Sequence, residues 1–157
     1  MTGWRLGYIG APKSIASACS KVQGQFTSGT CSITQKATIA AMEANPSVLK
    51  DMITAFKERR TLVLNALAEI PGLKTNHPGG AFYVFPDCST YFGKSHEGYT
   101  IKNASDLCLY LLEESLVALV TGDAFGDPKC FRISYAASEE TLIEAMRRIK
   151  QALSKLK

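Results

Sequence analysis

The chain has no long hydrophobic run, no strong excess of charge and no paired cysteines. No apolar stretch approaches the roughly 18 residues of a membrane-spanning helix, and no signal peptide opens the chain, so we expect no membrane segment. The formal net charge is +4 over 157 residues, and basic residues are adjacent only at Arg59-Arg60 and Arg147-Arg148. This scattered charge argues against nucleic-acid binding.

The cysteines predict a reducing compartment. They are odd in number and widely spaced, with no Cys-x-x-Cys pair, at Cys19, Cys31, Cys88, Cys108 and Cys130. Such spacing indicates free thiols and a cytoplasmic protein, and we expect Cys19, Cys108 and Cys130 to be buried as small apolar groups. A catalytic cysteine stays open as an alternative. His77 and His96 make no metal-ligand spacing with the cysteines, so we predict no metal site.

The remaining composition is that of an ordinary globular domain of mixed structure. Apolar residues make up 46% and charged residues 20%, which is typical of soluble folds. Periodicity and punctuation predict helices and strands in turn. We expect helices over 12–23, 32–43, 47–70 and 104–114 and after Ser138, strands over 1–8, 81–85, 116–120 and 131–135, and an irregular surface loop over 86–101.

The first eight residues, Met-Thr-Gly-Trp-Arg-Leu-Gly-Tyr, read as a strand with two faces. Trp4, Leu6 and Tyr8 alternate with Arg5 and Gly7. An arginine between two glycines is accessible to a ligand or another backbone, and its guanidinium is a rigid charged fork suited to phosphate or carboxylate. The alternative is an edge strand with a solvated arginine.

A second arginine lies in the run Phe-Arg-Ile-Ser-Tyr at 131–135. Phe131 and Ile133 share one strand face, and Arg132 and Ser134 share the other. The helix that follows carries an apolar stripe at Leu142, Met146, Ile149, Leu153 and Leu156. Without further context, Arg132 is a surface residue of a strand.

These motifs together resemble the class I aminotransferases, the pyridoxal-phosphate enzymes of fold type I. The opening run resembles the segment that follows the cofactor lysine in that family, and Phe-Arg-Ile-Ser-Tyr-Ala followed by Ser-Glu-Glu resembles the substrate-binding segment. Pro-Gly-Gly-Ala-Phe-Tyr at 78–83, the loop at 122–126 and Gln-Lys-Ala at 35–37 also match. The similarity is strongest to the bacterial aspartate and prephenate aminotransferase branch.

The resemblance implies an α/β fold and a specific place in the family architecture. We expect residues 1–46 to be the end of the large cofactor-binding domain, and residues 47–157 to be the small C-terminal domain with its long connecting helix. The chain would then represent the C-terminal part of such an enzyme, beginning just after the Schiff-base lysine. None of its own lysines lies in a matching context, so we expect the chain alone to be inactive.

The resemblance also implies chemistry, site residues and partners. Arg5 would bind the phosphate of pyridoxal phosphate, and Arg132 the α-carboxylate of an amino acid. The intact enzyme would be a cytoplasmic homodimer that transfers an amino group between aspartate or glutamate and a 2-oxo acid. The alternatives are a related fold-type-I enzyme such as a β-lyase, which would share Arg132, and a non-catalytic interaction module.

Overall fold

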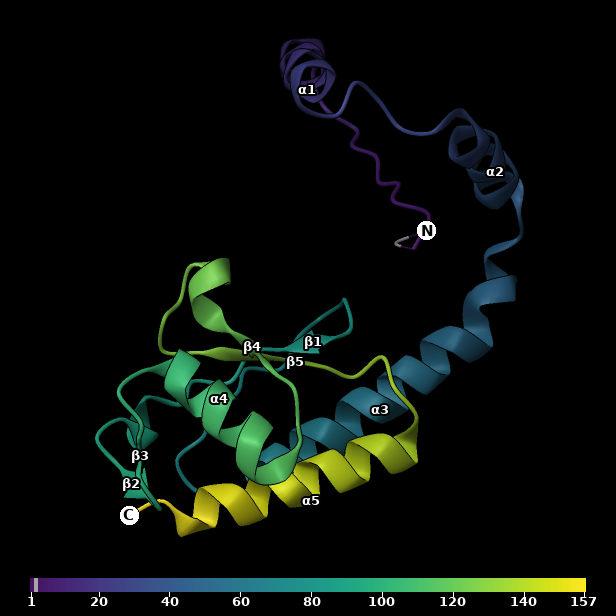
Figure 1. Cartoon of the computed structure of the whole chain (residues 1–157). Helices are drawn as coiled ribbons and strands as arrows, with labels where there is room; N and C mark the ends of the chain where they lie inside the picture. The colour runs from purple at the N-terminus through teal and green to yellow at the C-terminus, as the bar shows by residue number, and fades with distance from the viewer. Residues whose placement is uncertain (2) are drawn as a thin grey trace. The chain divides into compact units, whose positions relative to one another are not determined.

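The computed structural model describes Met1 and residues 3–157, and it divides into two compact units. Unit 1 is Met1–Lys50 and unit 2 is Asp51–Lys157. Figure 1 shows the course of the chain through both units. None of the helices among the described residues is long and apolar enough to cross a membrane.

Unit 1 contains two helices and no strand among its described residues. They are α1 (Lys13–Phe26) and α2 (Ser32–Glu43), followed by the 3₁₀ helix η1 (Pro46–Leu49). The strand predicted over 1–8 is wrong: residues 3–5 form a turn, in which the Trp4 N–H donates to the Met1 carbonyl, and Thr2 lies outside the described residues. A strand requires a neighbouring strand for its backbone groups, and this unit offers none among the residues described.

The helices of unit 1 leave most of their apolar side chains exposed. None of the residues of α1 is buried, and Thr34 is the buried residue of α2. Cys19 is therefore exposed, contrary to prediction. The helix α1 also continues to Phe26, three residues past its predicted end, because Gly24 lies within its hydrogen-bonded turns.

Unit 2 is built on a three-stranded antiparallel sheet in the order β1-β5-β4. The strands are β1 (Tyr83–Val84), β4 (Val120–Thr121) and β5 (Phe131–Ser134). In the register, Tyr83 lies opposite Ser134 and Val120 lies opposite Arg132. The central strand β5 is thus paired on both sides, which fixes the direction of each of its side chains.

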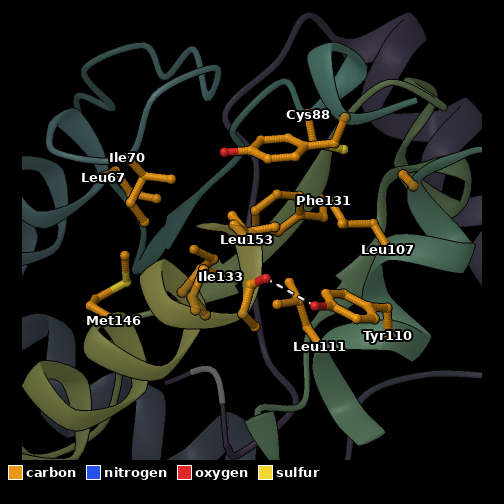
Figure 2. Packing of buried hydrophobic residues seen from close by; sticks show 14 of the residues in the cluster. Leu67, Ile70, Cys88, Leu107, Tyr110, Leu111, Phe131, Ile133, Met146 and Leu153 are labelled. Atoms are coloured by element: carbon orange, nitrogen blue, oxygen red, sulfur yellow. Dashed lines mark hydrogen bonds between the residues drawn. The ribbon is translucent and has the colours of Figure 1, made fainter. Parts of the chain in front are cut away.

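One face of this sheet carries the hydrophobic core. Helices α3 (Lys50–Ala68), α4 (Ala104–Ser115) and α5 (Glu139–Lys155) lie against it (Figure 1). Figure 2 shows Phe131 and Ile133 of β5 among side chains of all three helices. The Tyr110 hydroxyl on α4 donates to the Ala152 carbonyl on α5 at 2.9 Å, the dashed line in Figure 2, so this buried polar atom is satisfied.

Side-chain caps confirm two of the predicted helix starts. The Asn103 side chain accepts a hydrogen bond from the Asp106 N–H at 2.9 Å, and Ser138 accepts one from the Thr141 N–H at 3.3 Å. Both satisfy backbone donors that a helix leaves unpaired at its N-terminus. The apolar stripe predicted on the last helix is also confirmed, since all five of its residues are buried.

Two predictions between β1 and β5 are wrong. Residues 86–101 are not a simple surface loop but contain the 3₁₀ helix η2 (Ser89–Tyr91) and the hairpin of β2 (Ser95–His96) and β3 (Tyr99–Thr100). Cys88, Tyr91 and Ile101 within this segment are buried in the core. Of the predicted strand over 116–120, only Val120 is in a strand, as the first residue of β4. The strand does not begin at Leu116, because Leu116 adopts a left-handed conformation (φ 56°) that ends α4.

Candidate functional site

Arg132 lies on the face of the sheet opposite the core. Its neighbours along β5, Phe131 and Ile133, are buried, while Arg132 is half-buried and Ser134 is exposed. The predicted alternation along 131–135 is therefore confirmed. The strand pairing on both sides holds the Arg132 backbone rigidly, which is what a site for a small ligand requires.

Two aromatic rings form a platform for the Arg132 guanidinium. Its central carbon, Cζ, lies 4.3 Å from the centroid of the Tyr83 ring and 4.2 Å from that of the Phe125 ring. Both distances fall within the range of cation–π contact. Such a contact stabilises by about 0.5–1 kcal/mol at an exposed site and by about 2 kcal/mol when desolvated. The stacking restricts the guanidinium plane without using any of its N–H groups.

The same guanidinium makes no hydrogen bond or ion pair with any other residue that the structure describes. Arginine has five N–H donors in a planar fork. With all of them uncommitted, Arg132 is a preoriented site for a planar anion, and a carboxylate matches the fork with two parallel hydrogen bonds.

A tight loop positions Phe125 for this contact. The chain turns through the 3₁₀ helix η3 (Gly122–Phe125), the turn between β4 and β5 in Figure 1, and ends at Gly126 with φ 87°. Gly122 is required there: a Cβ atom would lie 2.2 Å from the Asp127 carbonyl oxygen and 2.3 Å from that of Cys130. The predicted glycine-bounded loop at 122–126 therefore places one wall of the arginine site.

Arg5 lies in unit 1, in the turn of residues 3–5. It is exposed, and its φ of 54° is in the left-handed region. Gly3 and Gly7 flank it, and a Cβ atom at either would meet nothing within 4 Å, so a ligand could approach the backbone closely. The two predicted site residues lie in different units, Arg5 in unit 1 and Arg132 in unit 2.

Two residues of the site went unnoticed in the sequence, namely Tyr83 and Phe125. Both stand in motifs that matched the family, but nothing in the motifs indicated a contact with Arg132. The alternation along β1 could have identified Tyr83, since it shares a sheet face with Ser134 and therefore with Arg132. No comparable signal exists for Phe125, because its position depends on the loop that Gly122 folds.

Comparison with known proteins places these features in a family. The family model for aminotransferase class I and II matches residues 1–149. The chain is 51% identical over 161 residues to a bifunctional aspartate aminotransferase and glutamate/aspartate-prephenate aminotransferase of Petunia hybrida, covering all of this chain and 34% of that protein. It is 46% identical to an aspartate aminotransferase of Rhizobium meliloti strain 1021, covering 99% of this chain and 38% of that protein.

Solved structures agree with the sequence relatives. The crystal structure of the Rhizobium meliloti aspartate aminotransferase matches with a TM-score of 0.84 and 46% identity, over 100% of this chain and 40% of that one. An aromatic aminotransferase from Pyrococcus horikoshii matches with a TM-score of 0.76 and 34% identity, over 98% and 40%. The chain thus spans between one third and two fifths of the length of its relatives. By fold and by sequence, it belongs to the class I and II aminotransferase family.

Proposed function

We propose that this chain provides the substrate-carboxylate and cofactor-phosphate contacts of a pyridoxal-phosphate-dependent aminotransferase. The reaction transfers an amino group between an amino acid, aspartate or glutamate, and a 2-oxo acid. The observation that carries the proposal is the Arg132 guanidinium, stacked on Tyr83 and Phe125 with its N–H donors uncommitted among the described residues.

Arg132 binds the α-carboxylate that all amino-acid substrates share. Two charge-assisted hydrogen bonds from one planar fork fix both the position and the rotation of the carboxylate. The substrate is then held with one particular bond at Cα in the orientation that the reaction requires, which lowers the entropic part of the barrier. The aromatic platform keeps the fork in this orientation before the substrate arrives.

Arg5 binds the phosphate of the cofactor. Its permanent charge and the open glycine positions beside it suit a tetrahedral dianion. When bound, pyridoxal phosphate supplies an electron sink for the charge left on the substrate Cα. Arg5 and Arg132 bind and orient, and neither moves a proton.

The same proposal covers partners and location. The assembled enzyme is a homodimer in the cytoplasm that acts on amino acids and 2-oxo acids. The free cysteines fit a reducing compartment, since among the described residues no two are joined. No lysine of this chain lies in the motif context of a cofactor lysine, so the 157-residue chain, mixed with pyridoxal phosphate and treated with borohydride, should keep no cofactor on a specific lysine.

Substitution of Arg132 by lysine in the assembled enzyme tests the assignment. We expect kcat/KM to fall alike for aspartate and for the monocarboxylic alanine, because both carry an α-carboxylate. Arg147→Lys, the same chemical change on the exposed face of α5, is the matched control. A loss confined to aspartate would contradict the proposal and assign Arg132 to the side-chain carboxylate. Dependence of turnover on a 2-oxo acid separates an aminotransferase from a β-lyase.

A further inference from the structure

A second cluster of chemically active groups lies away from Arg132, where the β2–β3 hairpin meets α4. His96, Glu97 and Glu114 each direct one ligand atom toward the others, and these atoms all lie within 4.8 Å of one another. His96 Nε2 lies 3.7 Å from Glu97 Oε1. From this arrangement we propose that the three side chains form a zinc-binding site, contrary to the expectation from the sequence.

The imidazole distinguishes this cluster from an ordinary group of surface acids. His96 Nε2 is inaccessible to solvent and has no hydrogen-bond partner. A buried polar atom without a partner is costly, and native proteins leave few such atoms unsatisfied, so a ligand bound at Nε2 would remove this cost. Nε2 lies on the side of the ring that faces the Glu97 carboxylate, where a metal ion would satisfy it.

The surroundings hold the ligands in place. The His96 ring meets the buried Tyr110 ring edge-on, with 6.3 Å between centroids. Glu97 and Gly98 have φ values of 44° and 90° and are the two left-handed residues of a tight hairpin turn. This backbone conformation fixes the direction of the Cα–Cβ bond of Glu97. Glu114 comes from the last turn of α4 and is only 22% exposed. The site therefore joins two elements.

The donor set favours zinc over calcium or magnesium. Calcium and magnesium take oxygen ligands, whereas zinc accepts imidazole nitrogen with carboxylate oxygen. Zinc bonds of about 2.0–2.2 Å place tetrahedral ligand atoms about 3.3–3.6 Å apart, so the carboxylates must move inward by roughly an ångström. The Glu97 side chain is 72% exposed and free to do so. Three protein ligands and one water complete the coordination.

One cation competes with the metal. Lys155 Nζ lies 3.7 Å from Glu114 Oε2, and its own side chain is 48% exposed. A bound zinc ion would displace this exposed and weak ion pair. Removal of the lysine charge should therefore strengthen zinc binding, which a purely structural role of the three side chains would not predict.

Zinc titration of the complete chain, followed by calorimetry, tests the proposal. We expect one equivalent of Zn²⁺ to bind, and His96→Gln and Glu114→Gln each to weaken binding by at least about tenfold. Glu97→Gln, at a side chain that is 72% exposed, should weaken it too, and Lys155→Met should tighten it. His77→Gln is the matched control, since His77 is the other histidine of the chain.

Cobalt serves as a spectroscopic probe against binding to the five cysteines. Coordination by His96 and the two glutamates gives no thiolate charge-transfer band, whereas coordination by cysteine does. The proposal is overturned by absence of zinc binding, by equal binding in wild type and His96→Gln, by a thiolate band of full intensity, or by unchanged binding in Glu97→Gln.

Discussion

Gly122→Ala should destabilise unit 2 more than Gly126→Ala, the other glycine-to-alanine change in the loop at 122–126. The new Cβ atom would lie 2.2 Å from one carbonyl oxygen and 2.3 Å from another, and both belong to backbone that cannot rotate away. Gly122 also donates its N–H to the Cys130 carbonyl at 2.8 Å. Overpacking costs about 1–3 kcal/mol, and a lost hydrogen bond costs about 1 kcal/mol. We expect a total loss of about 2–4 kcal/mol.

Urea unfolding followed by far-ultraviolet circular dichroism measures this loss. Fluorescence is less suitable, because Trp4, the single tryptophan, belongs to unit 1. Gly126→Ala isolates the conformational cost, since Gly126 has φ 87° and open space around it, and should lose about 1–2 kcal/mol. Gly80→Ala has neither problem and should stay within about 0.5 kcal/mol. If Gly122→Ala proves no worse than Gly126→Ala, the close backbone approach is wrong.

Three further predictions concern stability and reactivity. Tyr110→Phe removes the hydroxyl bonded to the Ala152 carbonyl and should cost about 1 kcal/mol of unfolding free energy, measured by urea denaturation; no loss would contradict that bond. In alkylation followed by mass spectrometry, Cys31 should react early, because backbone N–H groups lower its pKa, and Cys88 last, because burial raises its pKa to about 12; the reverse order would refute both assignments. Two guanidinium groups on α5 lower the pKa of Glu144 to about 2. The ionised carboxylate therefore stabilises the fold above pH 4.5, its ordinary pKa, and this stabilisation is lost as the pH falls toward 2. Glu144→Gln should reduce the dependence of the unfolding free energy on pH in that interval, and an unchanged pH profile would contradict the assignment.

The elements that the sequence predicted well are those whose signal is local. The stripe on α5 and the alternation along β5 each depend on a fixed period, and the caps at Asn103 and Ser138 depend on a side chain bonding a backbone N–H three residues on. Each of these can be read within one segment. The family was predicted correctly for the same reason, because each of its motifs is a continuous run of residues.

The errors arose where structure depends on a partner elsewhere in the chain. The opening residues alternate like a strand, yet a strand forms only beside another strand, and residues 3–5 turn instead. The segment 86–101 shows no period, because Cys88, Tyr91 and Ile101 are buried at irregular intervals by separate parts of the core. The three proposed zinc ligands depend on the fold in the same way, since Glu114 approaches the hairpin only in the folded chain.

For the candidate site, the sequence singled out the arginine but not the two rings that support it. The motif around Arg132 identified the guanidinium and its sheet face, both of which are local properties. The rings of Tyr83 and Phe125 come from a neighbouring strand and from a loop. Neither contact follows from the spacing of these residues along the chain.

The most direct test of the central claim compares glutamate with γ-aminobutyrate, which is glutamate without its α-carboxylate. In the assembled enzyme, Arg132→Lys replaces a bidentate guanidinium by an ammonium group. The variant should therefore lose one charge-assisted hydrogen bond, worth about 1.5–3 kcal/mol. We predict that kcat/KM for glutamate falls about 10- to 150-fold, while that for γ-aminobutyrate changes little. An equal loss for both amines would show that Arg132 does not hold the α-carboxylate.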